Sequence, residues 1–248
     1  LEESIKLAKD RIEKSKRELE TLIQNKSALD LQLAEKRKKQ NTIKSEIQVK
    51  ISRQKMLNDM EQSLEGYSRS VKYVLQACDK SHGLGGIHGA LAQLLKVEKR
   101  FETAIEMALG GALQYIVTDT EEDAKKAIEF LKNNRMGRAT FLPISAVRGH
   151  ELDKNILYKV ESYIGYCGIA SELVNCDPKF KEIVRNLLGK VIVMDNLDAA
   201  IKIAKDFKYG FRIVTLEGDI ISTSGSMTGG SADSRSSGIL SRKREILE

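Results

Sequence analysis

FETAIEMALGGALQYIVTD, residues Phe101–Asp119, and FKEIVRNLLGKVIVMD, residues Phe180–Asp195, carry one pattern twice. In both stretches apolar side chains recur every three or four residues, which predicts a short helix with one buried face. A glycine then ends the helix, and a run of apolar, mostly β-branched residues predicts a buried strand that leads to an aspartate. The repeat indicates an internal duplication with at least one helix and one strand in each copy.

Both copies continue in the same way beyond this aspartate. Thr120 and Asn196 are residue types that cap helices, and each precedes a helical pattern that ends at a glycine. The strands predicted next are 139–143 and 211–216. We therefore expect an α/β (α+β) domain of mixed sheets and helices, built from two αβαβ subdomains related by a pseudo-twofold. The pairs that match across the copies are Phe101 with Phe180, Leu109 with Leu188, Gly110 with Gly189, Asp119 with Asp195, Ala124 with Ala200 and Gly137 with Gly210.

Residues 1–64 have a different character. Apolar residues recur there at alternating spacings of three and four, without Gly or Pro, which is typical of a coiled-coil helix. Such a stripe needs a partner helix, and residues 236–248 are predicted to begin one. Because the chain starts without Met inside the heptad pattern, we expect it to be a fragment of a longer protein. The seam residues include Leu1, Ile5, Ala8, Ile12, Leu19, Leu22, Leu29, Leu33, Ile43, Ile47, Leu57 and Leu64.

These patterns divide the chain into four predicted regions. Residues 1–64 form the coiled-coil helix, and 65–150 form the first subdomain. Residues 151–235 form the second subdomain and include a glycine-rich segment, GDIISTSGSMTGGS, at Gly218–Ser231. Closely spaced glycines allow one backbone to approach another. We expect an ordered segment because of its apolar residues Ile220, Ile221 and Met227, and a flexible tether is the alternative.

Four short motifs carry a resemblance to a known family. They are GIHG at 86–89, ETAIEMALGGALQYIVTD at 102–119, GRATFLP at 137–143 and GSMTGG at 225–230. Together they resemble the hinge of bacterial and archaeal structural maintenance of chromosomes (SMC) proteins, and the resemblance covers essentially the whole chain. It implies a homodimerisation hinge at the end of a long antiparallel coiled coil, with an ATPase head at the far end. Two paired hinges then form a V or ring that holds DNA.

The resemblance also places the dimer contact. In the family the glycine-rich segment belongs to this contact, which maps here onto Gly225, Ser226, Met227, Thr228, Gly229 and Gly230. Many relatives have a further glycine where this chain has Ser224, so the sequence departs from the family pattern at that residue. The family further implies a cytoplasmic, nucleoid-associated protein that is active in chromosome condensation and segregation.

The net charge of +6 makes nucleic acid the first candidate for an acidic partner. A solvated coiled-coil surface would show the same charges, so both readings stay open. The sparse aromatic residues and the lack of a base-reading motif predict weak, non-specific binding. A nucleic-acid-binding module whose association is driven by the coiled coil is the alternative function. The predicted DNA contacts are Lys36, Arg37, Lys38, Lys39, Lys50, Arg53, Lys55, Arg235, Arg242, Lys243 and Arg244.

We expect no catalytic site, cofactor or metal in this chain. The glycines at 83–89 lack the spacing and the Lys-Ser/Thr of a phosphate-binding loop. A nucleotide-dependent enzyme is therefore the weakest of the three hypotheses. Cys78, Cys167 and Cys176 are too widely spaced for a zinc site, and an odd number of cysteines fits a reducing cytosol.

Overall fold

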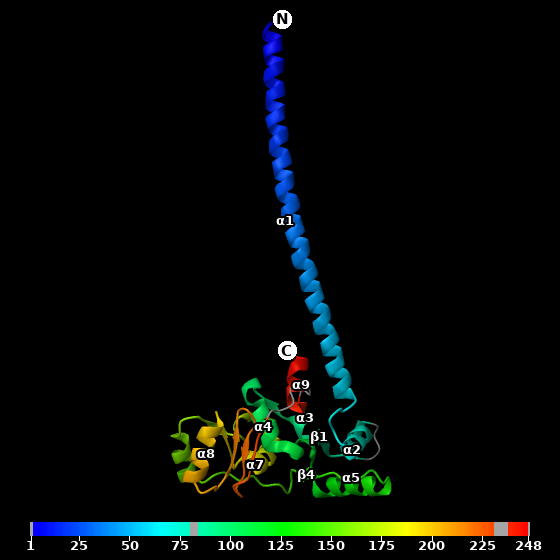
Figure 1. The fold of residues 1–248 in the computed structure, drawn as a ribbon. Coiled ribbons are helices and arrows are strands. Elements are labelled where there is room, and N and C mark those ends of the chain that lie inside the picture. The colour runs from blue at the N-terminus through cyan, green and yellow to red at the C-terminus, as the bar shows by residue number, and fades with distance from the viewer. Residues whose placement is uncertain (1, 80–83, 231–237, 248) are drawn as a thin grey trace. The chain divides into compact units, whose positions relative to one another are not determined.

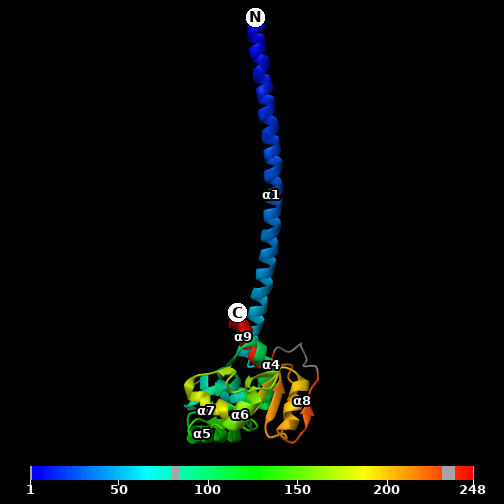
Figure 2. The same ribbon diagram turned by 90° about the vertical axis from the view of Figure 1, so that its left-hand side faces the viewer.

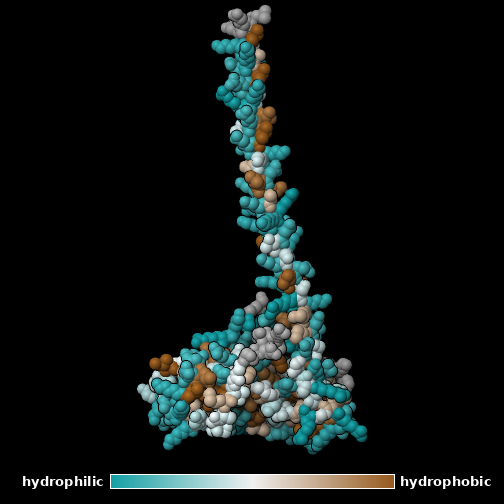
Figure 3. All heavy atoms as spheres, viewed as in Figure 1, coloured by the Kyte–Doolittle hydropathy of each residue, from teal (hydrophilic) through white to brown (hydrophobic). Residues whose placement is uncertain are grey.

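The computed structural model describes residues 2–79, 84–230 and 238–247 of the chain. These residues fall into two units, 1–56 and 57–248, which are described separately. Most of the first unit is helix α1 (Glu2–Gln62), and its apolar residues are exposed at intervals between charged ones, as Figure 3 shows. The helix predicted for residues 1–64 is confirmed, with its end two residues earlier.

The last two seam residues belong to the second unit. Leu57 is 3% exposed, and Leu64 is buried in the core in a turn with a φ of +51°. Leu64 contributes to the globular core rather than to a coiled-coil seam. Heptad spacing cannot show this change of partner, because it records which side of a helix is apolar and not what covers it.

The first copy contains a three-stranded sheet in the order β1-β3-β4. Strand β3 pairs with β4 in parallel and with β1 in antiparallel orientation. Helix α5 connects the two parallel strands and starts at Thr120, whose hydroxyl accepts a hydrogen bond from the Asp123 amide. The elements, several of them visible in Figure 1, are α2 (Arg69–Asp79), β1 (Ile87–Ala90), α3 (Leu91–Leu94), β2 (Lys96–Val97), η1 (Lys99–Phe101), α4 (Glu102–Leu109), η2 (Gly110–Gln114), β3 (Ile116–Thr118), α5 (Glu121–Asn133) and β4 (Phe141–Pro143).

The second copy contains a five-stranded sheet in the order β10-β9-β8-β7-β5. Helix α8 lies beside this sheet in Figure 2 and starts at Asn196, the second predicted cap. Asp177 and Pro178 begin a 3-10 turn before the predicted helix rather than the helix itself. The elements are α6 (Lys154–Glu161), β5 (Tyr166–Ile169), β6 (Val174–Asn175), η3 (Pro178–Phe180), α7 (Lys181–Leu188), β7 (Val191–Met194), α8 (Leu197–Asp206), β8 (Arg212–Thr215), β9 (Ile220–Ile221) and β10 (Met227–Thr228), and α9 (Ile239–Leu247) follows.

The two copies have the same backbone plan in detail. The aspartates that end β3 and β7 donate their amides to the carbonyls of Gly86 and Gly165, each over 2.8 Å. Both glycines have positive φ, +71° and +88°. The first strand of each copy has an irregularity at the same place, before Gly89 and before Gly168. The predicted duplication is therefore confirmed by topology and by register.

A short pairing between the copies locates the pseudo-twofold axis. Strands β2 and β6 are antiparallel, with Lys96 opposite Asn175 and Val97 opposite Val174. The numbers of equivalent residues in this part of the chain differ by 79, as for Phe101 and Phe180, so Lys96 faces its own counterpart. Since a twofold operation exchanges equivalent residues, the pseudo-twofold axis passes between Lys96 and Asn175. One core cluster, which includes Ile105 of α4 and Val184 of α7, extends across both copies.

Candidate functional site

The glycine-rich segment forms a β-hairpin on the edge of the five-stranded sheet. Strand β9 pairs with β10 through Met227 opposite Ile221 and Thr228 opposite Ile220, and β9 also pairs with β8. The Ser222 amide donates to the Ser226 carbonyl and closes the turn. The segment is thus ordered as predicted, up to Gly230.

Among the described residues, no strand pairs with the outer side of β10. Because hydrogen-bonded and non-bonded pairs alternate in an antiparallel ladder, Met227 directs its N–H and C=O away from β9. The Met227 side chain is also 53% exposed. Strand β10 is the outermost strand of its sheet. It therefore offers both backbone groups and an apolar side chain to a further strand.

The glycines and serines of the hairpin have different roles. A Cβ atom on Gly229 would collide with the Asp219 carboxylate of the same hairpin, whereas Gly225 and Gly230 face open space at positive φ. A side chain at position 229 would thus require the Asp219 carboxylate to move. The Ser224 hydroxyl lies 2.7 Å from that of Ser222, inside the turn.

The three-stranded sheet has a corresponding free edge at β4. Thr140 accepts a hydrogen bond from the Ile116 amide, and Ile144 donates one to the Thr118 carbonyl. The alternate residues Phe141 and Pro143 therefore direct their backbone groups to the outer side of β4. The Pro143 carbonyl accepts hydrogen bonds from the Ala146 and Val147 amides, so Phe141 is the residue that offers both groups to a further strand. Pro143 has no N–H, which limits how a strand can pair there. In the second copy the equivalent strand, β8, is covered by the β9–β10 hairpin.

Comparison with known proteins agrees with this architecture. Residues 84–204 match the family model described as the SMC proteins Flexible Hinge Domain. The crystal structure of an asymmetric dimer of the Geobacillus stearothermophilus SMC hinge domain is 44% identical, with a TM-score of 0.73 over 81% of this chain and 79% of that one. The chain belongs to the SMC hinge family. The predicted resemblance is confirmed.

Curated relatives are longer than this SMC hinge. The Chromosome partition protein Smc of Bacillus subtilis is 43% identical over 195 residues, which cover 79% of this chain and 16% of the relative. The Methanocaldococcus jannaschii protein of the same name is 34% identical over 224 residues, 90% of this chain and 17% of the relative. The chain therefore spans about a sixth of the length of these relatives.

The basic residues of the returning helix α9 do not form the exposed surface that their charge predicts. Arg242 is 4% exposed and donates to the Glu65 carbonyl over 2.8 Å. Lys243 donates its ammonium to the Gln93 carbonyl, and burial lowers the pKa of that ammonium. Arg244 pairs with the Glu102 carboxylate at 2.6 and 3.2 Å. These three cations attach α9 to the domain, which corrects the expectation that they face DNA.

The other predicted DNA contacts have different positions. The residues on α1 are exposed along the helix: Lys36, Arg37, Lys38, Lys39, Lys50, Arg53 and Lys55. They belong to the first unit, whereas α9 belongs to the second. Arg235 lies outside the described residues. Among the described residues, the predicted DNA contacts that are exposed therefore lie on α1.

Two acids of α4 were missed by the sequence reasoning. Glu102 has a side chain that is 8% exposed, and Glu106 accepts a hydrogen bond from the Ile239 amide at the start of α9 over 3.0 Å. Burial raises the pKa of Glu106. Their spacing of four residues in an otherwise apolar helix was the available signal, because it places both on one side.

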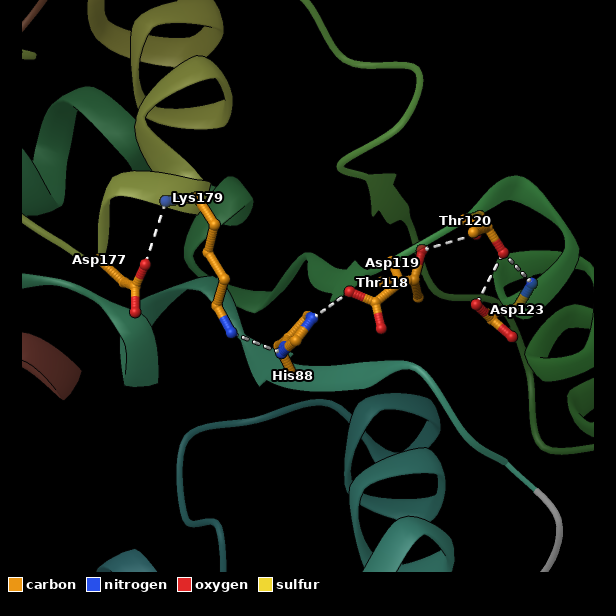
Figure 4. Close-up of polar contacts among 7 residues, drawn as sticks. All are labelled: His88, Thr118, Asp119, Thr120, Asp123, Asp177 and Lys179. Carbon is orange, nitrogen blue, oxygen red and sulfur yellow. Dashed lines mark hydrogen bonds and ion pairs between the residues drawn. The ribbon is translucent and has the colours of Figure 1, made fainter.

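A second polar network joins the two copies (Figure 4). The Nε2 atom of His88 lies 2.6 Å from Asp119, and its Nδ1 atom lies 3.5 Å from the Lys179 ammonium. The imidazole also contacts the Phe180 ring edge to face. Since Lys179 and Phe180 belong to the second copy and His88 to the first, this network reinforces the subdomain boundary.

Within residues 2–79, 84–230 and 238–247, no group of three or more His, Cys, Asp or Glu residues is placed to hold a metal ion. In the same residues, no helix is long and apolar enough to cross a membrane. Cys167 and Cys176 are partly buried, and burial raises the pKa of both thiols. A thiol with a raised pKa is a weak nucleophile at neutral pH.

Proposed function

We propose that the chain is a homodimerisation hinge whose β10 edge pairs with the β4 edge of a second copy. The observation that carries the proposal is that β10 and β4 are edge strands of the two sheets, with no further strand paired to them among the described residues. A twofold operation brings each edge against the unlike edge of the partner, so both junctions form at once. The three-stranded sheet of one chain would then continue the five-stranded sheet of the other.

The dimeric crystal structure of the Geobacillus stearothermophilus SMC hinge domain supports this proposal. The glycine-rich segment contributes in a specific way. Gly225 and Gly230 have no atom near their Cβ positions, and an open flank allows another backbone to approach. In the whole protein, this dimer would join two coiled-coil arms into a V or ring that holds DNA.

The test removes one edge hydrogen bond without changing the hairpin. In Met227→Pro the lost N–H is the one directed away from β9, so the β9–β10 pairing remains. Each dimer would lose this bond twice, which at about 0.5–1.5 kcal/mol per bond weakens association about fivefold to 150-fold. Met227→Val keeps the N–H and is the matched control. Sedimentation equilibrium of the full chain measures both dissociation constants.

Equal dissociation constants for the two variants would contradict edge pairing. Leu22→Ser on α1 then distinguishes the alternative, because a dimer that dissociates only in this variant is held by the coiled coil. Gly229→Glu is a poor test, since the collision with Asp219 would disturb the hairpin itself.

Non-specific DNA contact is a second candidate function. The observation that favours it is the run of four exposed basic residues at 36–39 on α1. Phosphate contacts of this kind need no base readout and weaken steeply with salt. Replacing all four by Glu should abolish retention of duplex DNA at low salt. Reversal of four exposed cations that are distributed over α5 and α8, namely Lys125, Lys132, Lys202 and Lys205, is the control with the same net charge. Equal losses in both variants would show a general charge effect instead.

A further inference from the structure

In the first copy, helix α9 packs against the outer surface of the subdomain. Helix α9 lies against α3, β2 and α4, with Leu240 buried between polar contacts. Arg244 binds Glu102 of α4, the Ile239 amide binds Glu106, and Lys243 reaches the Gln93 carbonyl. The receiving surface is therefore acidic on α4 and apolar at Leu95 and Val97, and the helix that it receives is basic.

The duplication gives the second copy the same surface with the opposite charge. With the offset of 79 residues, Glu102 corresponds to Lys181, and Glu106 corresponds to Arg185. The buried positions are conserved in character, since Ile105 (0% exposed) corresponds to Val184 (3% exposed). The backbone is thus the same while both acids of α4 are replaced by cations on α7.

In the second copy a cavity lies where α9 lies in the first. It has a volume of about 410 Å³, within the range of protein ligand sites. Its apolar lining includes Ile169, Val174 and Val184, which are all buried. Its charged lining consists of the cations Lys154, Lys181 and Arg185 and the acids Glu151 and Glu172, so cations are in excess by one. Among the described residues, neither Lys154 nor Lys181 forms an ion pair.

A loop of the chain already covers one side of this cavity. The Glu151 carboxylate lies 3.0 Å from the Arg185 guanidinium, and Leu152 lines the cavity. The Gly149 amide and the Arg148 carbonyl hold the loop to Glu182 and Asn186 of α7. Within its own chain, the cavity thus already binds an acidic residue followed by an apolar one, Glu151 and Leu152. The remaining volume is free for a longer segment with the same pattern.

We propose that this cleft, lined by α6, the β5–β6 turn and α7, is a docking site for an acidic amphipathic helix of a partner protein. The partner would insert one apolar side chain above Val174 and Val184. A carboxylate four residues further along would meet Lys181, in the arrangement that Leu240 and Arg244 have on α9 with the charges exchanged. The proposal does not depend on dimerisation.

The probe is α9 itself with its three cations reversed. The peptide GILSEEEEIL corresponds to residues 238–247 with Arg242, Lys243 and Arg244 replaced by Glu. It is cross-linked between positions 241 and 245, because so short a peptide is not helical in water. Fluorescence anisotropy should show saturable binding to the full chain, with a dissociation constant on the order of 100 μM. The basic parent peptide, cross-linked in the same way, should not bind.

Charge exchange in the cleft gives the decisive comparison. Lys181→Glu should raise the dissociation constant of the acidic peptide at least tenfold. Lys202→Glu on α8 changes the net charge equally and should leave this dissociation constant unchanged. The double variant Lys181→Glu, Arg185→Glu should reject the acidic peptide and bind the basic one. Far-UV circular dichroism checks that each variant is folded.

Three outcomes would overturn the proposal. The first is no saturable binding of the acidic peptide up to millimolar concentration. The second is equal weakening by Lys181→Glu and Lys202→Glu, which would indicate only long-range attraction. The third is displacement of the peptide by a short single-stranded oligonucleotide that binds more tightly and depends on Lys181, because the cleft would then be a phosphate site.

Discussion

Helices α4 and α7 occupy equivalent places in the two copies, yet they meet different surroundings. On α4, Glu102 and Glu106 are covered by α9, and Glu102 is nearly inaccessible. On α7, the equivalent Lys181 and Arg185 line an open cavity, and Arg185 is about half exposed. The comparison shows that a duplicated fold can keep its backbone and core while its two outer surfaces diverge in charge and in what covers them.

The outer faces of α4 and α7 can diverge in charge because they are less constrained than the core. The backbone plan depends on buried apolar positions and on glycines with positive φ, so changes there affect the whole domain. The outer faces of α4 and α7 depend only on their own neighbours. One face anchors the returning arm, and the other is free to bind something else.

The largest expected effect comes from making α4 resemble α7. Glu102→Lys introduces the residue found at the equivalent position 181 and places it against Arg244. An uncompensated, buried charge pair of like sign should cost about 3 kcal/mol or more. Equilibrium urea unfolding measures the loss, and hydrogen exchange of the α9 amides shows whether that helix detaches.

The reciprocal change in the second copy is the matched control. Lys181→Glu lies at the exposed first turn of α7, where an acid is favourable, so the free energy of unfolding should change by about 0.5 kcal/mol at most. A loss similar to that of Glu102→Lys would mean that both faces are equally important for stability, and the comparison would fail.

An intermediate effect is expected where the copies are alike. Gly86→Ala and Gly165→Ala each add a Cβ at positive φ, in collision with Asp123 and Asp195 respectively. Both should destabilise the chain by about 1–3 kcal/mol. Gly85→Ala, which meets no atom within 4 Å, should be nearly neutral in thermal unfolding. A large loss in only one copy would show that the two turns are not equivalent.

The smallest effect concerns pH. Burial raises the pKa of Glu106, so the folded chain holds a proton more firmly than the unfolded chain does. The contribution of Glu106 is therefore complete below the pKa of the unfolded state and is lost as the pH rises through the folded pKa. Glu106→Gln keeps the acceptor for the Ile239 amide but cannot ionise.

The difference in unfolding free energy between Glu106→Gln and the parent chain should consequently shift in favour of the variant from pH 4.5 to 7.5. Urea titrations at both pH values measure this change. A shift in favour of the parent would mean that the carboxylate form is the stabilising one. No equivalent shift is expected for Arg185→Gln at the matching position of α7.

Much of the fold could be predicted because its signals are local. The caps Thr120 and Asn196 act within three residues, and the heptad spacing of α1 repeats along one helix. Gly137 and Gly210 are less informative, because α5 and α8 end earlier, at Asn133 and Asp206. There, non-glycine residues adopt positive φ, at Arg135 and Lys208 respectively.

The candidate site was less accessible to sequence reasoning. The glycine-rich segment indicated an ordered element, but only the strand order shows that β10 is an edge and that β4 is another. The cations Arg242, Lys243 and Arg244 predicted an exposed patch. The partner of Arg244, Glu102, lies 142 residues earlier in the chain, so the sequence alone could not show that Arg244 faces inward.

The sequence by itself determined the duplication, the two helix–strand units and the long helix, because periodicity, caps and glycines act over a few residues. The sequence also shows that the two copies differ in charge at equivalent positions, with Glu102 and Glu106 in the first copy and Lys181 and Arg185 in the second. Only the tertiary structure decided what these charges mean. The cost of a charge depends on its burial and on its partner, and both are set by segments far apart in the chain. One pair became an anchor for α9, and the other became the rim of an open cleft.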